Sequence, residues 1–293
     1  MAISLYTHAL VRSQLEPRRI AQAFLLGLLL FPALAFCQLT ADDIMARVAA
    51  NQDAAIQVRA HYVYRQHVHS TSHQTNGKLM REETADYDIF PTPTRTERKL
   101  SSIQGRYWKK GKYLDYNGVP IPDRDSIDAE ITHDLLDEEN NEREGKEGVM
   151  SNLFPLTSKK QQDYKFTLLG EEALHGRPAY HLSFQPKDKD DIEFSGEAFI
   201  DKEEFQPVHV FTKLNRKLPF FVRGVMGVDL PGIGFNVQYS RQEPGIWFPE
   251  TFGTEFGLNI FHFYKRNITI SLKNSDFRKT HVDSTITIPP ASE

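Results

Sequence analysis

The sequence has 293 residues, a formal net charge of −4 and a single cysteine, Cys37. A mildly acidic chain lacks the basic surface that nucleic-acid binding requires, so we expect no nucleic-acid partner. One cysteine excludes an internal disulfide, and a chain of this length can bury a full core without one.

The N-terminal stretch has the organisation of an export signal. Arg12, Arg18 and Arg19 precede an apolar run at 20–36 that contains Pro32. This run is shorter than the roughly 20 predominantly apolar residues of a membrane-spanning helix. A positive region followed by an apolar region and small residues is typical of a secretory signal peptide. We therefore expect residues 1–37 to be a signal peptide and the protein to be exported.

Cys37 leaves two alternatives open for the end of this signal. Residues 34–37, LAFC, resemble a bacterial lipobox, in which the cysteine is lipidated and anchors the mature protein in the outer membrane. A lipobox has a small residue just before its cysteine, whereas Phe36 is large. We favour removal of Cys37 with the signal peptide and keep the lipoprotein as the alternative.

The first element expected in the mature chain is a helix. Thr40 is a good N-cap residue, and Asp42 and Asp43 would lie in the first turn, where the helix dipole favours negative charge. Ile44 and Val48 would share one face. The pattern predicts a helix from about residue 40 to about residue 57 that packs on a larger element.

From residue 61 the apolar pattern changes to a period of two, which is typical of strands. Asn76-Gly77 and Asn117-Gly118 are strong hairpin signals. Helices of the βαβ kind do not separate these segments, so we predict an antiparallel sheet. The predicted strands are 61–70, 79–89, 95–103, 107–108, 112–116, 164–169, 178–184, 197–201, 208–214, 220–228, 235–239, 247–256 and 260–272.

Residues 122–149 interrupt the strands with acids and helix formers. Ile127, Ile131 and Leu135 recur there at helical spacing. We expect a helical insertion that covers the sheet as a lid. No repeat or linker divides the chain, so residues 38–284 are expected to form one domain, followed by a flexible tail at 285–293.

Four short motifs follow one another in the second half of the chain. They are 176–182 (GRPAYHL), 199–201 (FID), 206–208 (QPV) and 245–249 (GIWFP). In this order they resemble motifs of the LolA/LolB-like envelope proteins, which include outer-membrane lipoprotein-sorting proteins. The resemblance implies a mainly antiparallel α+β fold: an unclosed, curved β-barrel with an N-terminal helix and a helical lid insertion. It also implies a periplasmic location and a concave apolar face that holds lipoprotein acyl chains or lipid.

Apolar side chains that alternate along the strands are the candidate ligand-binding residues. Such stripes form either a packed core or the lining of an apolar cavity, and both alternatives stay open here. Two of the candidates belong to segment 218–235, which is apolar on both faces and is expected to form a hairpin near the barrel mouth. The predicted ligand-binding residues are Tyr62, Tyr64, Tyr180, Leu182, Phe184, Phe220, Phe221, Phe235, Val237, Tyr239, Phe252 and Phe256.

The sequence has four histidines between residues 61 and 73 and none of the common catalytic motifs. His61, His67, His69 and His73 would share one face of a straight strand. Two histidines two positions apart, such as His67 and His69, can hold a metal ion together. No cysteine or carboxylate stands in register with them along the sequence, so we expect exposed strand histidines, with no metal and no cofactor. The G-x-S-x-G, H-E-x-x-H and phosphate-loop patterns are absent, so we expect no enzyme.

The leading hypothesis is therefore a periplasmic carrier for lipoprotein acyl chains or lipids. An alternative is an envelope stress sensor of the same fold that binds a membrane-bound protein partner. A hydrolase is a third, weaker alternative.

Overall fold

The computed structural model describes residues 39–91, 96–119, 121, 154–188, 194–214, 228–229, 233–260 and 264–280. The chain divides into two compact units, and all of these residues except Leu39 belong to the second unit, Thr40–Glu293. The predicted signal peptide, the helical insertion at 122–149 and the tail at 285–293 lie outside the described residues. In the part of the chain that is described, no helix is both long and apolar enough to cross a bilayer.

The predicted N-terminal helix is confirmed as α2, Ala41–Arg59. Thr40 Oγ1 accepts a hydrogen bond from the Asp43 N–H, and the Asp43 carboxylate accepts one from the Thr40 N–H, both at 3.1 Å. This reciprocal capping explains why the helix begins here. Its buried face contains Ile44, Met45 and Val48. The helix packs against the short helix α5, Ser158–Gln161, against the edge strand β5 and against β11 in the middle of the sheet.

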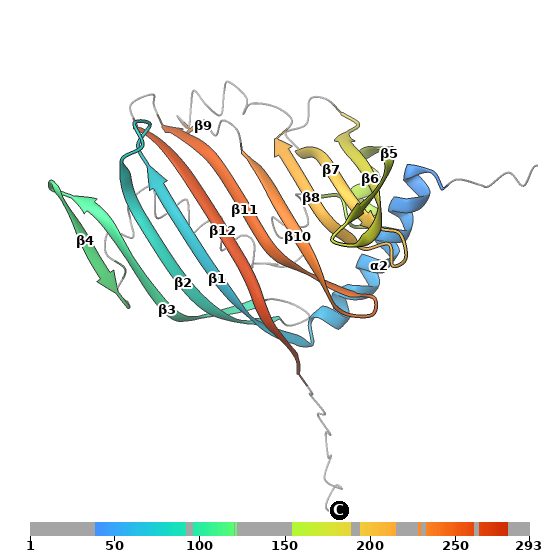
Figure 1. The fold of residues 1–293 in the computed structure, drawn as a ribbon, viewed down its shortest axis with the longest axis horizontal. Coiled ribbons are helices and arrows are strands. Elements are labelled where there is room, and N and C mark those ends of the chain that lie inside the picture. The colour runs from blue at the N-terminus through green and yellow to red at the C-terminus, as the bar shows by residue number, and fades with distance from the viewer. Residues whose placement is uncertain are drawn as a thin grey trace, which may run out of the picture. The chain divides into compact units, whose positions relative to one another are not determined.

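The remaining elements are strands of one antiparallel sheet, as predicted. Their order in the sheet is β4-β3-β2-β1-β12-β11-β10-β8-β7-β6-β5, and β9 pairs with β11 (Figure 1). The end strands β4 and β5 do not pair with each other, so the sheet is curved but unclosed. The strands are β1 (Tyr62–His73), β2 (Leu79–Pro91), β3 (Thr96–Lys109), β4 (Lys112–Asn117), β5 (Tyr164–Leu174), β6 (Arg177–Pro186), β7 (Phe194–Asp201), β8 (Pro207–Leu214), β9 (Val228–Asp229), β10 (Gly234–Glu243), β11 (Ile246–Ile260) and β12 (Tyr264–Lys279).

One predicted hairpin, at Asn117-Gly118, is wrong. The strand before it, β4, is an edge of the sheet, and the next described strand, β5, lies at the opposite edge. Gly118 does have the positive φ of a turn, at 87°, but its N–H donates to the carbonyl of Ile103 instead of closing a hairpin. The actual turn between β3 and β4 is at Lys110-Gly111, where both residues have positive φ.

Several predicted strand boundaries also differ. The segments predicted at 95–103 and 107–108 are parts of one long strand, β3, because Gly105 between them continues the pairing with Glu83. The predicted break between 256 and 260 is wrong, because β11 continues to Ile260 and β12 begins at Tyr264. Most of the strand predicted at 220–228 lies outside the described residues.

Candidate binding surface

One cross-strand row of apolar side chains runs through the sheet from β5 to β3. Neighbouring members are direct partners in the antiparallel register. Every member is buried except the first, which is half-buried. In sheet order they are Leu168, Leu182, Ala198, Val210, Val237, Phe252, Leu272, Val68, Ala85 and Ile103. Because side chains alternate across a sheet, this row defines one face, the apolar face.

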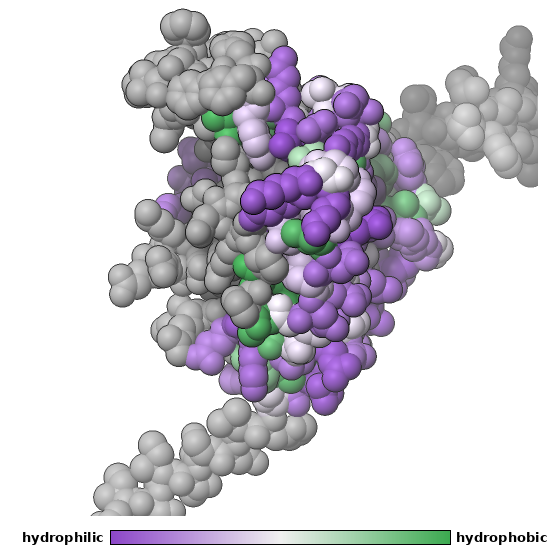
Figure 2. Space-filling view, turned by 90° about the vertical axis from the view of Figure 1, so that its left-hand side faces the viewer, coloured by the Kyte–Doolittle hydropathy of each residue, from purple (hydrophilic) through white to green (hydrophobic). Residues whose placement is uncertain are grey.

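The residues one position along each strand form a matching row on the opposite, polar face. They are Thr167, Ser183, Glu197, Phe211, Asn236, Gly253, Ser271, His69, Thr84, Gln104 and Asn117. The one large apolar member, Phe211, is 51% exposed. The coloured surface in Figure 2, which is seen from the β4 side, is also mostly hydrophilic. Along these two rows, the period of two therefore separates apolar from polar side chains.

The centre of the apolar face is a large buried cluster, the apolar cluster. It draws on β1, β2, β3, β10, β11 and β12, and only Ile233 among its buried members lies outside a strand. A sheet normally buries such a face against a second layer of structure. Among the described elements, however, α2 and α5 make their main contacts with β5 and β11. The two described helices therefore cover only part of the apolar face.

The structure brings half of the predicted ligand-binding residues together at this cluster. Phe235, Val237, Phe252 and Phe256 are buried members, and the Phe235 and Phe252 rings lie 5.2 Å apart. Tyr64 and Tyr239 pack against the cluster.

The other described candidates belong to separate contacts nearer to α2. Tyr180, Leu182 and Phe184 are buried on β6. The Phe184 ring is 4.9 Å from that of Phe154, and Tyr180 stacks on Phe205. Tyr62 packs on Phe248, with 5.0 Å between the rings. Phe220 and Phe221 lie outside the described residues.

Sequence reasoning missed a polar group of residues on the apolar face. Arg81 and Glu83 are only 6% and 5% exposed, and the Tyr116 hydroxyl donates to Glu83 at 2.5 Å. Counting back by twos from Ile89 would have placed both charges on the buried side of β2. The contribution of Tyr116 could not be found this way, because β4 joins the group through tertiary pairing.

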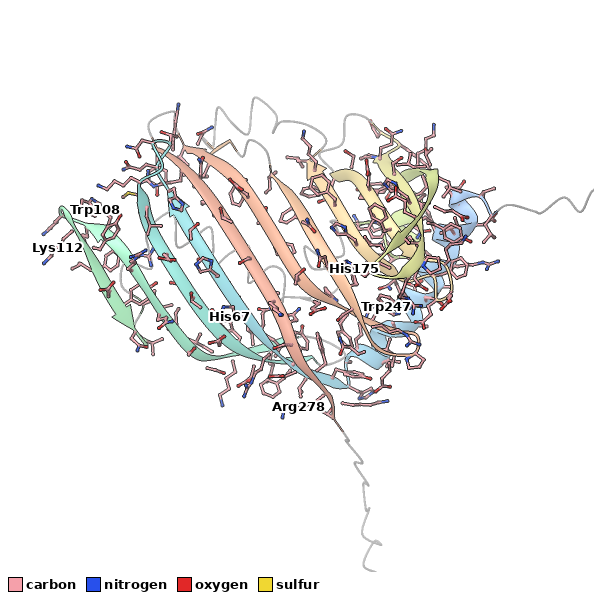
Figure 3. The ribbon with its side chains drawn as sticks, viewed as in Figure 1. His67, Trp108, Lys112, His175, Trp247 and Arg278 are labelled. Atoms are coloured by element: carbon pink, nitrogen blue, oxygen red, sulfur yellow. The ribbon has the colours of Figure 1, made fainter. Side chains whose placement is uncertain are left out.

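The histidines lie on the polar face with carboxylates beside them, which corrects the expectation that none stands in register. A ring nitrogen of His67 is 2.7 Å from Asp86, and one of His69 is 3.3 Å from Glu82 (Figure 3 shows His67). The sequence hid these partners because they come from β2. Each contact lowers the pKa of its carboxylate, Asp86 or Glu82. No group of three or more potential metal ligands occurs within the described ranges.

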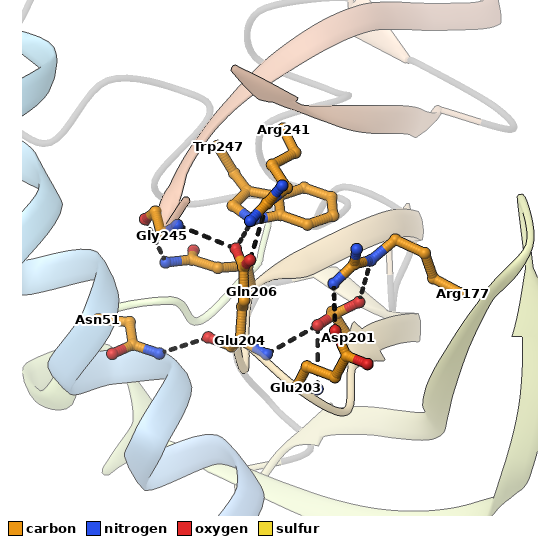
Figure 4. Close-up of polar contacts among 9 residues, drawn as sticks. All are labelled: Asn51, Arg177, Asp201, Glu203, Glu204, Gln206, Arg241, Gly245 and Trp247. Carbon is orange, nitrogen blue, oxygen red and sulfur yellow. Dashed lines mark hydrogen bonds and ion pairs between the residues drawn. The ribbon is translucent and has the colours of Figure 1, made fainter. Parts of the chain in front are cut away.

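The motif residues FID and GRPAYHL meet in a hydrogen-bonded turn between β7 and β8 (Figure 4). Asp201 is fully buried and accepts hydrogen bonds from Arg177 Nε at 2.5 Å and from the N–H groups of Glu203 and Glu204. Burial alone would raise the pKa of Asp201, but these donors outweigh burial and lower it. The aspartate therefore holds the turn as a carboxylate.

Glu204 connects this turn to the GIWFP motif. Its carboxylate accepts from Trp247 Nε1 and Arg241 Nε, both at 2.7 Å, and from the Gly245 N–H at 3.0 Å. Asn51 of α2 donates to the Glu204 carbonyl at 2.8 Å (Figure 4). Contacts of three motifs and of Glu204 thus hold the β7–β8 turn, the β10–β11 hairpin and α2 against one another, which is a structural role.

No protein-family model matches the sequence, and no curated protein matches it either. Similar solved structures exist. A domain described as an outer membrane lipoprotein-sorting protein from Vibrio parahaemolyticus is 12% identical with a TM-score of 0.37, covering 82% of this chain and 94% of that one. A DUF1329 family protein from Desulfovibrio piger is 11% identical with a TM-score of 0.38, covering 84% and 95%.

A LolA superfamily protein from Nitrosomonas europaea is 12% identical, with a TM-score of 0.34 and coverage of 83% of this chain and 94% of that one. Identities and TM-scores this low say nothing about a ligand. The unclosed antiparallel sheet with an N-terminal helix, which the LolA/LolB-like resemblance implied, is confirmed by the structure itself.

Proposed function

We propose that this protein is an exported carrier that binds the acyl chains of lipids or lipoproteins on its apolar face. The supporting observation is the apolar row, in which every side chain from Leu168 on β5 to Ile103 on β3 is a hydrocarbon. A continuous apolar strip suits a long, flexible hydrocarbon better than it suits a compact polar substrate.

The energetics of such binding come from the hydrophobic effect. Each methylene group moved from water to the apolar face contributes about 0.8 kcal/mol, so affinity grows with the length of the chain. The interaction has no directional bonds to break, which permits release to another apolar acceptor. Because the row is buried in this structure, binding requires the face to open.

The proposed location is the periplasm, outside the cytoplasmic membrane. The expected signal peptide at residues 1–37 supports export. Acyl chains that cross an aqueous compartment must be shielded from water, and a reversible apolar face meets that need.

A contact-quenching experiment tests the proposal. Phe252 lies on the apolar face and Phe211 on the polar face, and their strands are joined through β10. Phe252→Trp and Phe211→Trp variants of the mature, delipidated protein would be titrated with a brominated fatty acid, which quenches indole emission on contact. We expect quenching of the added fluorescence in Phe252→Trp only, after subtraction of the wild-type signal from Trp108 and Trp247.

Thermal unfolding of both variants checks that they are folded, because enlarging a core side chain costs roughly 1–3 kcal/mol. Equal quenching at the two positions, or none at Phe252→Trp, would contradict the proposal. An apolar face that is covered by a protein partner instead of an acyl chain would give no quenching by a fatty acid.

A further inference from the structure

The apolar face does not stay apolar up to the β4 edge. There it carries a polar cluster made of Arg81 and Glu83 on β2, Tyr107 on β3 and Tyr116 on β4. The sheet register places this cluster directly beside the apolar cluster: Glu83 pairs with Ser70, and Ser70 pairs with Ile270. Tyr116 itself packs against the apolar cluster.

The members of the polar cluster contact one another closely. Tyr116 donates its hydroxyl to Glu83 Oε2 at 2.5 Å, and Arg81 Nη1 is 3.4 Å from that hydroxyl and 3.8 Å from Glu83 Oε2. The guanidinium also lies 5.3 Å from the centre of the Tyr107 ring. Gly105 provides the space for Tyr116, since a Cβ at Gly105 would stand 2.5 Å from its hydroxyl.

The protonation of this cluster follows from its surroundings. Burial and the neighbouring Glu83 carboxylate raise the pKa of Tyr116. The phenol therefore stays protonated at neutral pH and acts as a hydrogen-bond donor, not as a nucleophile. Arg81, Glu83 and Tyr116 thus contribute one cation, one anion and one hydrogen-bond donor to the cluster.

Stability of the sheet does not explain this cluster. The Arg81 and Glu83 side chains are 7% and 6% exposed, and charges that are buried this far lose their hydration. A buried ion pair stabilises a fold no better than apolar residues of similar size do, and often less well. Apolar residues at both positions would simply have continued the face. A polar group of a ligand is a more direct reason for charges at this place.

We infer that the polar cluster is the headgroup subsite of the acyl-binding face and that it selects a zwitterionic amphiphile. This inference rests on the proposed function. Arg81 is suited to a phosphate, which guanidinium groups bind through paired hydrogen bonds, and Glu83 is suited to a cationic ammonium. The chain would run over β1, β12 and β11 to β10, a distance of about 19 Å at ~4.8 Å for each strand step.

The test compares three amphiphiles that share one dodecyl chain: dodecylphosphocholine, dodecyl phosphate and dodecanol, each below its micelle concentration. Their affinities would be measured by displacement of the brominated fatty acid from Phe252→Trp protein. We expect dodecylphosphocholine to bind about tenfold more tightly than the other two, the factor expected of one hydrogen bond to a charged group.

The preference should disappear in an Arg81→Met/Glu83→Leu double variant, in which apolar side chains replace both charges. A matched control is Arg106→Met/Glu82→Leu. This ion pair joins Arg106 on β3 to Glu82 on β2 at 2.8 Å and lies on the polar face, so its removal should leave the preference unchanged. Tyr116→Phe, which removes one hydroxyl, should weaken the preference and serves as a second variant if the double variant unfolds.

Equal affinity of the wild-type face for all three amphiphiles, or a preference that survives the loss of Arg81 and Glu83, would overturn the headgroup subsite. In that case binding of dodecanol would still support the proposed function. Failure of dodecanol and the brominated fatty acid to bind at all would overturn both.

Discussion

At the scale of single residues, the Glu204 carboxylate shows how one side chain can stabilise the fold. Its carboxylate accepts three hydrogen bonds, whereas that of its neighbour Glu203 is exposed and contacts only Arg177 at 3.1 Å among the described contacts. Glu204→Ala should lower the free energy of unfolding by about 2 kcal/mol, the order expected when hydrogen bonds to a charged group are lost. Glu203→Ala should change it by less than about 0.5 kcal/mol.

Urea unfolding monitored by tryptophan fluorescence measures both values. A loss in Glu203→Ala as large as that in Glu204→Ala would show that the connection to Trp247, Arg241 and Gly245 does not stabilise the fold.

The carboxylates of Glu204 and Asp201 should make the folded protein less stable at acid pH. Burial alone would raise the pKa of Glu204, but Trp247, Arg241 and the Gly245 N–H outweigh burial and lower it. The pKa of Asp201 is lowered as well. The unfolded chain therefore binds protons at these two carboxylates more readily than the folded protein does. The stabilisation is fully present above the ordinary pKa values, 4.5 for Glu and 3.8 for Asp. It is lost as the pH falls through the lowered pKa values of the folded protein.

We therefore expect the free energy of unfolding to be level above about pH 5 and to decline below about pH 4.5. The decline should be shallower in Glu204→Gln, which cannot ionise at this position. Denaturant titrations across this pH range measure the decline in both proteins. An identical pH dependence in the wild type and in Glu204→Gln would show that Glu204 does not cause part of the acid destabilisation.

At the scale of the elements, two strand glycines show how differently the sheet tolerates a side chain. A Cβ at Gly196 on β7 would stand 2.0 Å from the carbonyl oxygen of Phe211 on β8, whereas one at Gly253 on β11 would meet nothing within 4 Å. Gly196→Ala should therefore separate β7 from β8 and destabilise the fold by about 3 kcal/mol.

Gly253→Ala should be neutral or stabilising by up to about 1 kcal/mol, because alanine loses less backbone entropy on folding. The difference in denaturation midpoint between the two variants measures this contrast. Equal midpoints would mean that β7 and β8 adjust freely to the added methyl group.

At the scale of the whole molecule, acyl binding and folding should be linked. A ligand that binds the apolar face of the folded protein stabilises it by about 2.7 kcal/mol at a hundredfold excess over its dissociation constant. The melting temperature of the delipidated protein should therefore rise with dodecanol concentration, and scanning calorimetry measures this rise. A melting temperature that stays constant or falls would show that the apolar face is only an internal core.

Local sequence patterns predicted a large part of this molecule. The start of α2 follows from Thr40 and Asp43, because capping depends on residues three positions apart. The alternation of Phe235, Val237 and Tyr239 placed these side chains on one face, because successive residues of a strand point to opposite sides. Half of the predicted ligand-binding residues lie at the apolar cluster, and their binding of a ligand stays a prediction.

Only the tertiary structure decided which strands are neighbours. The first strand, β1, pairs with the last, β12, so that Val68 meets Leu272 in the apolar row. The carboxylate beside His67 and the hydroxyl beside Glu83 also come from other strands. A period of two is a property of each strand by itself, whereas pairing and register depend on packing and hydrogen bonds between segments far apart in the chain. For that reason the apolar face and the burial of Arg81 and Glu83 could be anticipated from the sequence, and the contact between Glu83 and Tyr116 could not.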